Sequence, residues 1–212
     1  TGNGQPLPPP PAELEALSGW ICGAAWLVLP RHNRHRAVVG LCERAVLVQP
    51  GSRPQLGLAC ALACTGRPQR ALLVLQQTAG WRAADPGCML LAAMLLFKAG
   101  RVHESGRLAE QLAAAEPSPA RALQLAGVCK LLLSRQPQPL GARLRRQAAA
   151  VGLLQAACAA DPHSPGNAHN CAVGCMELRD LPLAEQYAVR AQRLDRSNPA
   201  HGCLLAAVWA GR

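Results

Sequence analysis

The sequence is poor in aromatic residues, which number four Trp, one Tyr and one Phe in 212 residues. Cores built from β-sheets rely on aromatic and β-branched side chains, whereas alanine and leucine favour helices. Alanine and leucine carry most of the apolar content of this chain. Because half of its residues are apolar, it can bury a sizeable core. The composition therefore predicts a helical protein and argues against a β-rich fold.

Long uninterrupted apolar runs are also missing. The longest, from Trp20 to Leu29, is stopped by Pro30 and is too short to cross a bilayer. Residues 1–11, TGNGQPLPPPP, lack the apolar segment of a secretory signal and predict a disordered tail of polyproline character. We expect no transmembrane segment and no secretory leader within this sequence.

Acidic residues are scarce, with 12 Asp and Glu against 22 Lys and Arg, a net charge of +10. The only lysines are Lys98 and Lys130. A basic balance favours acidic partners, nucleic acid or an anionic membrane. The arginines are scattered, but Arg143, Arg145 and Arg146 form a cluster. We interpret this cluster as a solvated helix face, with phosphate binding as the alternative.

Sequence motifs for catalysis are absent. No G-x-x-x-x-G-K phosphate loop and no nucleophile elbow occurs, so we expect no enzymatic activity and no cofactor. His169, Cys171 and Cys175, with His163 nearby, could be metal ligands. Structural zinc sites need four convergent ligands, usually at a tighter cysteine spacing. Buried thiols are therefore the preferred interpretation, and no metal is expected.

The ten cysteines do not form a disulfide pattern. Most lie inside apolar helical runs, where a free cysteine behaves as a small hydrophobic residue. This placement predicts reduced thiols and a cytoplasmic, intracellular setting, with the nucleus or a cilium as alternatives. The cysteines in such runs are Cys22, Cys60, Cys88, Cys129, Cys158, Cys171, Cys175 and Cys203.

A repeat is visible in the turn residues of the chain. Gly66-Arg67 recurs 34 residues later as Gly100-Arg101, each time between an apolar run and an amphipathic run. This order predicts a helix, a tight turn and a second helix, with glycine in the left-handed conformation that ends the first helix. Prolines are predicted to close the second helices: Pro50, Pro86, Pro117 and Pro162. Small residues mark predicted helix contacts: Ala45, Ala71, Ala150, Ala157, Ala184 and Ala191.

With this period and these small residues, the sequence from about Gly19 to Arg212 resembles the tetratricopeptide repeat. It departs from the family where large aromatic positions hold Leu, Met, Cys or Ala. The resemblance implies an all-α fold, a right-handed solenoid of tandem helix-turn-helix units within residues 12–212. The predicted units are 19–51, 52–85, 86–119, 120–164 with an insertion at 135–146, 165–198, and a terminal helix at 199–212.

The resemblance also implies a binding groove, because the first helices of such repeats line the concave face. The side chains expected there are mainly apolar with some basic ones, which suits an amphipathic helix or extended segment that carries acids. They are Arg53, Leu56, Cys60, Leu90, Met94, Phe97, Lys98, Arg121, Gln124, Val128, Leu131, His169, Val173 and Met176.

Together these features predict a non-catalytic scaffold or adaptor that binds a peptide or helix of a partner protein, as part of a larger complex. The alternative is an adaptor that binds RNA or anionic lipid through its arginines. Relatives that hold a chaperone's carboxylates use Lys and Asn at fixed groove positions. Here those positions hold no donor side chain, which argues against that mode: they are Gly23, Leu27, Gly57, Gly87 and Leu90.

Overall fold

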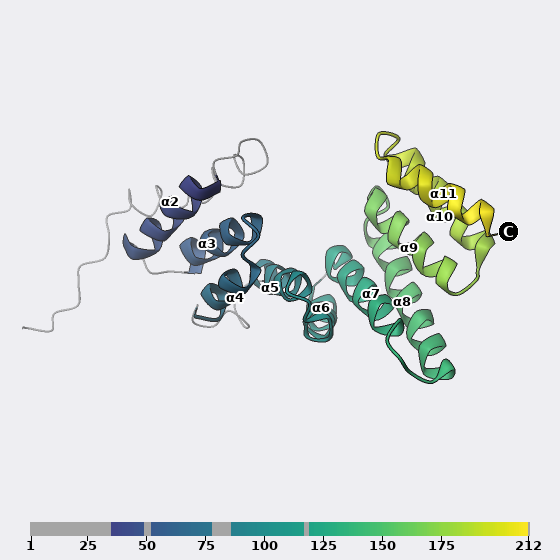
Figure 1. The fold of residues 1–212 in the computed structure, drawn as a ribbon, viewed down its shortest axis with the longest axis horizontal. Helices are drawn as coiled ribbons and strands as arrows, with labels where there is room; N and C mark the ends of the chain where they lie inside the picture. Colours follow the sequence, from purple (N-terminus) through teal and green to yellow (C-terminus); the bar gives the residue numbers. More distant parts are fainter. Residues whose placement is uncertain (1–34, 49–51, 78–85, 117–118, 212) are drawn as a thin grey trace, which may run out of the picture. The chain divides into compact units, whose positions relative to one another are not determined.

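The computed structural model describes residues 35–48, 52–77, 86–116 and 119–211, and within them the chain is helical with short turns (Figure 1). They form two compact units, Thr1–Cys88 and Met89–Arg212. No described helix is both long and apolar enough to span a membrane. The predicted tail 1–11 and residues 19–34 of the first predicted unit lie outside the described residues. The helices are α2 (His35–Val48), α3 (Ser52–Cys64), α4 (Pro68–Gln77), α5 (Pro86–Lys98), α6 (Val102–Ala115), α7 (Ala120–Ser134), α8 (Leu140–Ala160), α9 (Pro165–Glu177), α10 (Leu181–Leu194) and α11 (Pro199–Ala210).

The helices follow the repeat seen in the sequence. Helices α3, α5, α7, α9 and α11 begin at residues 52, 86, 120, 165 and 199, where the sequence places the starts of units. One proline prediction is wrong: α4 ends at Gln77, and Pro86 is the first residue of α5. Proline is tolerated there because a first-turn N–H has no partner within the helix. Pro162 does follow the end of α8 at Ala160, as predicted.

Three of the turns between paired helices, α3–α4, α5–α6 and α9–α10, share one conformation. Gly66 and Gly100 have φ of 74° and 80°, and Arg179 occupies the same left-handed region with φ of 64°. At each turn the next residue donates its N–H to a carbonyl five positions earlier, as in the bond from Arg101 to Leu96 of 2.9 Å. This Schellman arrangement satisfies carbonyls left open at a helix end. The predicted glycine turns are therefore confirmed, and arginine replaces glycine in the third.

In the unit Thr1–Cys88, α3 packs against both α2 and α4. Five consecutive residues of α3, from Leu58 to Leu62, are buried, so this stretch of the helix is covered around its whole circumference. Helix α2 contributes Val39, Cys42 and Ala45 at intervals of three residues, which is one helical face. In the described part of this unit, α2, α3 and α4 thus pack side by side with α3 in the middle.

In the unit Met89–Arg212, each helix from α6 to α11 packs against the next, and α9 also contacts α7 and α11. Ser105 on α6 donates its Oγ–H to the carbonyl of Ala93 on α5 at 2.7 Å. The contacts of α9 with α7 and α11 join the first helices of successive units. This is the layered packing of a solenoid. The six predicted contact alanines of the whole chain are all buried. The largest cluster of buried residues comprises Leu131, Ala150, Val151, Leu154, Cys158, Cys171, Ala172, Cys175, Ala184, Ala188, Leu205 and Val208.

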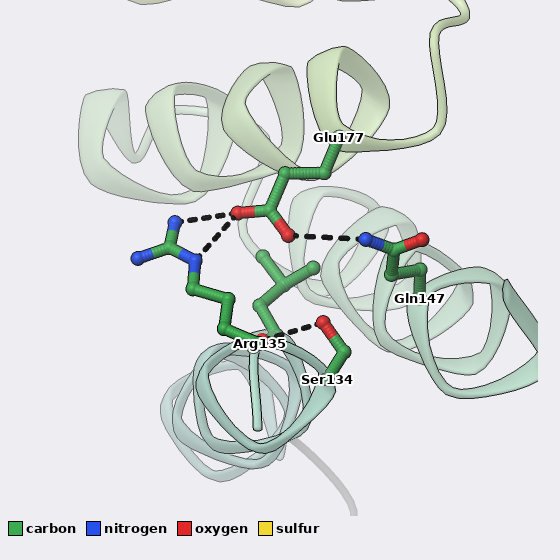
Figure 2. A network of polar contacts seen from close by, with 5 residues as sticks. Ser134, Arg135, Gln147 and Glu177 are labelled. Atoms are coloured by element: carbon green, nitrogen blue, oxygen red, sulfur yellow. Dashed lines mark hydrogen bonds and ion pairs between the residues drawn. The ribbon is translucent and has the colours of Figure 1, made fainter. Parts of the chain in front are cut away.

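The predicted insertion in the fourth unit is mostly helical. Only residues 135–139 lie outside helices between α7 and α8, so the arginine cluster belongs to α8, whose length is 21 residues. Near this turn, Arg135 and Gln147 both donate to Glu177 at the end of α9 (Figure 2). Gln147 is buried. The three-residue network therefore joins the ends of α7 and α9 to α8.

Candidate functional site

A cavity of about 370 Å³ opens between the first helices of the Met89–Arg212 unit. Its wall is mostly apolar, with three polar side chains. It is lined by Leu90, Met94 and Phe97 of α5, by Arg121, Gln124, Leu125 and Val128 of α7, and by Asn170 of α9.

Helical periodicity explains how these side chains come together. Leu90, Met94 and Phe97 are spaced by four and three residues, so they share one face of α5. The opposite side of the helix is buried and contains Ala92, Ala93, Leu95 and Leu96. The face with Leu90 is therefore directed away from the core. Met94 keeps 45% of its surface exposed. The cavity thus presents apolar surface that the fold leaves uncovered.

The electrostatics of the cavity are basic. Arg121 is exposed, and no ion pair to it is found among the described residues. The sequence has no acidic residue between Glu116 and Asp161, which includes all of α7. A carboxylate placed beside Arg121 would therefore meet an uncompensated positive charge.

Six of the fourteen residues predicted for the groove line this cavity: Leu90, Met94, Phe97, Arg121, Gln124 and Val128. For Cys60 and Leu131 the prediction is wrong, because both are buried in cores at 3% and 4% exposure. Lys98 is exposed at the end of α5, outside the cavity wall. Leu56 is half-buried in the other unit, and the side chain of Arg53 lies outside the described part.

The three predicted groove residues of α9 do not line the cavity either. His169 is engaged with His201, Met176 packs against the buried cluster, and Val173 is half-buried. The sequence reasoning instead missed Leu125 and Asn170. These occupy the same position of the repeat, one residue after Gln124 and His169. The apolar face of a helix is about 100° wide and includes such neighbours at its edge. The predicted stripe was narrower and therefore left out Leu125 and Asn170.

His169 on α9 and His201 on α11 face each other, with 3.0 Å between their Nδ1 atoms. His201 is buried and His169 is half-buried. Burial, and then the charge of His201, lower the pKa of His169. A neutral pair can share one N–H between the two nitrogens, whereas two imidazolium ions cannot. The pair therefore joins α9 to α11 best when it is not fully protonated.

The cysteines considered as metal ligands lie in the core. Cys171 and Cys175 have no exposed surface, and the hydrogen bond with the thiol of Cys158 raises the pKa of Cys171. His169 meets His201 rather than these thiols. In the described ranges, no three His, Cys, Asp or Glu side chains are grouped so that they could hold a metal ion.

A second hollow, of about 540 Å³, lies over α6, α7 and α8. Its wall includes the small residues Ala113, Ala114, Ala149 and Gly152. Its two charged residues, Lys130 and Glu110, pair with each other at 2.5 Å. Because the charges of Lys130 and Glu110 neutralise each other, this hollow offers a charged ligand less than the cavity beside Arg121 does.

The fold is shared with solved structures of repeat proteins. PilF of Pseudomonas aeruginosa aligns over 94% of this chain and 87% of its own, with a TM-score of 0.74 and 15% identity. TTC0263, a TPR protein of Thermus thermophilus, aligns over 74% of this chain and 80% of its own, at a TM-score of 0.65 and 20% identity. MamA of Desulfovibrio magneticus aligns over 85% of this chain and 96% of its own, at a TM-score of 0.65 and 18% identity.

No family model matches the sequence, and no curated protein matches it. At the identities of the solved structures, the likeness establishes the fold and not the activity. The chain has the tetratricopeptide-repeat fold, an all-α, right-handed solenoid, as the sequence predicts.

Proposed function

Starting from the tetratricopeptide-repeat fold, we propose that this protein is a non-catalytic scaffold that binds a segment of a partner protein in the cavity between α5 and α7. The observation that carries the proposal is the cavity itself. Three apolar side chains of α5 face an arginine of α7 that has no acidic partner among the described residues. Solenoids commonly use such surfaces between repeats for binding.

The chemistry of the wall specifies the kind of segment. Leu90, Met94 and Phe97 favour an apolar side chain, and methionine adapts to different shapes. Arg121 favours an Asp, a Glu or a terminal carboxylate close to that side chain. Gln124 and Asn170 can bond with backbone N–H and C=O groups of a bound segment. The proposed ligand is therefore a short peptide or helix with an apolar anchor beside an acid.

A peptide library displayed on phage tests this proposal. The full chain is expected to select sequences in which an apolar residue lies near Asp or Glu. A selected peptide should bind the Leu90→Asp/Met94→Asp variant at least about tenfold more weakly, since an anchor residue at the centre of an interface contributes that much or more. It should also lose affinity for Arg121→Glu, and a peptide with Lys in place of its acid should regain part of that loss.

The matched control is Leu194→Asp, because Leu194 is exposed to 38%, much like Met94, but lies at the end of α10 outside the cavity. This variant should bind the peptide as the unchanged protein does. Circular dichroism must show that all variants remain helical. Equal affinities of the unchanged protein and the Leu90→Asp/Met94→Asp variant would exclude the cavity as the binding site.

A further inference from the structure

The end of the α7–α8 hairpin carries an uncovered apolar and basic surface, which we name the hairpin tip and define as residues 135–146. Residues 136–142 of the tip contain no charged side chain. Leu140 and Leu144 are exposed to 60% and 45%. The cluster Arg143, Arg145 and Arg146 follows directly and is exposed. The tip therefore has an uncharged end that is followed by a cluster of positive charges.

The tip extends beyond the part of α8 that builds the core. Helix α8 has 21 residues against 15 in α7 and 13 in α9, and its first buried residue is Gln147. The preceding seven residues are about two turns of helix. Figure 1 shows these turns and the loop before them at one end of the hairpin. The side chains of residues 140–146 are thus mostly exposed to solvent and do not build the core.

Hydrogen bonds fix the tip to the body of the hairpin. Gln138 donates through Nε2 to the carbonyls of Leu133 and Ser134 at 3.2 and 2.8 Å. Arg146 donates through Nη1 to Leu133 at 3.1 Å. These bonds satisfy carbonyls at the end of α7. The leucines and arginines of the tip are therefore held in a defined arrangement.

Within the tip, Arg135 pairs with Glu177, but the charge of the arginine cluster is uncompensated. No acidic residue occurs between Glu116 and Asp161, and in the described part of the chain neither Arg143 nor Arg145 forms an ion pair. Cations near the start of a helix oppose its dipole and disfavour its formation. Helix stability therefore does not explain why arginines occupy these positions.

We propose that the hairpin tip docks onto an anionic phospholipid membrane surface, with Leu140 at the boundary of the acyl chains and the arginines at the phosphates. Arg143 and Arg146 lie about 4.5 and 9 Å beyond Leu140 along the helix axis. The headgroup layer on one side of a bilayer is about 5–8 Å thick. Leucine at its inner boundary therefore places the guanidinium groups at headgroup depth.

The same features disfavour the other anionic partners. No aromatic residue occurs between Phe97 and Tyr187, so the hairpin offers no stacking platform for RNA bases. Arg143 and Arg145 are separated by about 160° around the helix. An acidic helix laid along one side of α8 would reach only one of them, whereas a membrane that meets the end of the hairpin reaches both.

The test is co-sedimentation of the full chain with phosphatidylcholine vesicles, with and without phosphatidylserine, at physiological salt. We expect partitioning only onto the vesicles that contain phosphatidylserine. Arg143→Gln/Arg145→Gln should lower the partition coefficient about 25-fold, because each arginine near such a surface contributes about fivefold. Leu140→Ser/Leu144→Ser should also lower it without any change in net charge. Arg146 is left unchanged because of its bond to Leu133.

The matched control is Arg193→Gln/Arg196→Gln, which makes the same change in net charge at two exposed positions of another hairpin. It should lower partitioning by less than about threefold. An equal fall of the partition coefficient in the control would mean that vesicle binding depends on net charge alone, and would overturn the proposal. So would no binding to phosphatidylserine vesicles, or tight binding of a short RNA that does not depend on Leu140 and Leu144.

Discussion

Arg135, just after the end of α7, donates from Nε to Oε1 of Glu177 at the end of α9, with 3.0 Å between the two atoms. The residues are 42 positions apart in the sequence. Gln147 of α8 donates to the other carboxylate oxygen at 3.4 Å (Figure 2). One carboxylate therefore couples two successive repeat units at the end where the fourth unit carries its insertion.

Replacement of Glu177 by alanine is expected to lower the free energy of unfolding by about 1–2 kcal/mol. The carboxylate is mostly shielded, and its loss leaves the buried amide of Gln147 without this acceptor. Arg135→Ala should cost less than about 1 kcal/mol, because its guanidinium is largely exposed and ion pairs at the surface contribute little. Urea denaturation of both variants measures the difference. Equal losses would contradict the assigned role of Gln147.

Replacement of Arg179 by glycine is expected to stabilise the protein by about 0.5–1 kcal/mol. Arg179 holds φ of 64°, a conformation that costs a residue with a Cβ about 1–2 kcal/mol, and the greater freedom of glycine in the unfolded chain offsets part of this gain. Arg179→Ala removes the same side chain but keeps the strained conformation, so it should give no gain. Thermal unfolding of the pair separates backbone strain from loss of the arginine.

Replacement of Gly127 by alanine is expected to destabilise the protein by about 1–3 kcal/mol through overpacking. A Cβ at Gly127 would lie 2.7 Å from Cγ of Leu154. Gly152→Ala is the matched control, because nothing lies within 4 Å of a Cβ there; it should stabilise helix α8 by up to about 1 kcal/mol.

The Leu154→Ala change tests the cause of the Gly127 effect. Alone it should cost about 2–5 kcal/mol by leaving a cavity. Combined with Gly127→Ala it should cost less than the sum of the two changes, because the smaller side chain makes room for the new methyl group. Strict additivity would show that the two sites are not in contact.

Stability should fall as the pH is lowered through the range where histidine titrates. The pKa of His169 is lowered in the folded protein, whereas in the unfolded chain it is about 6.5. The unfolded state therefore binds more protons below about pH 7, and the free energy of unfolding decreases from there toward the lowered pKa. The variant His169→Asn should show a flatter dependence between pH 8 and 5 in urea titrations. Parallel curves would exclude His169 as a source.

Local chemistry made much of the fold predictable from the sequence. Gly66 and Gly100 identified two turns because few other residues adopt positive φ. The third turn has Arg179 at this position, and an arginine does not indicate a turn in the sequence. Pro86 was misassigned because proline suits the first turn of a helix as well as the position after one. Such ambiguities are resolved only by the packing around them.

The candidate site was less predictable than the fold. The heptad-like spacing of Leu90, Met94 and Phe97 placed them on one face, but spacing does not say where that face is covered. Leu131 has the same character as Val128 and is buried by α8 and α9. The hydrogen bond between His169 and His201 joins two residues 32 positions apart on different helices, a separation that no local pattern encodes.

Photo-crosslinking of a bound peptide shows directly whether a partner segment lies between α5 and α7. A peptide selected by the chain would carry a photoreactive group beside its apolar anchor, and mass spectrometry would map the crosslinks. We expect crosslinks to Met94, Phe97 and Leu125, which disappear when unlabelled peptide is in excess. Crosslinks that fall instead on the outer surface of α6 and α8, around Ala113 and Gly152, would contradict it.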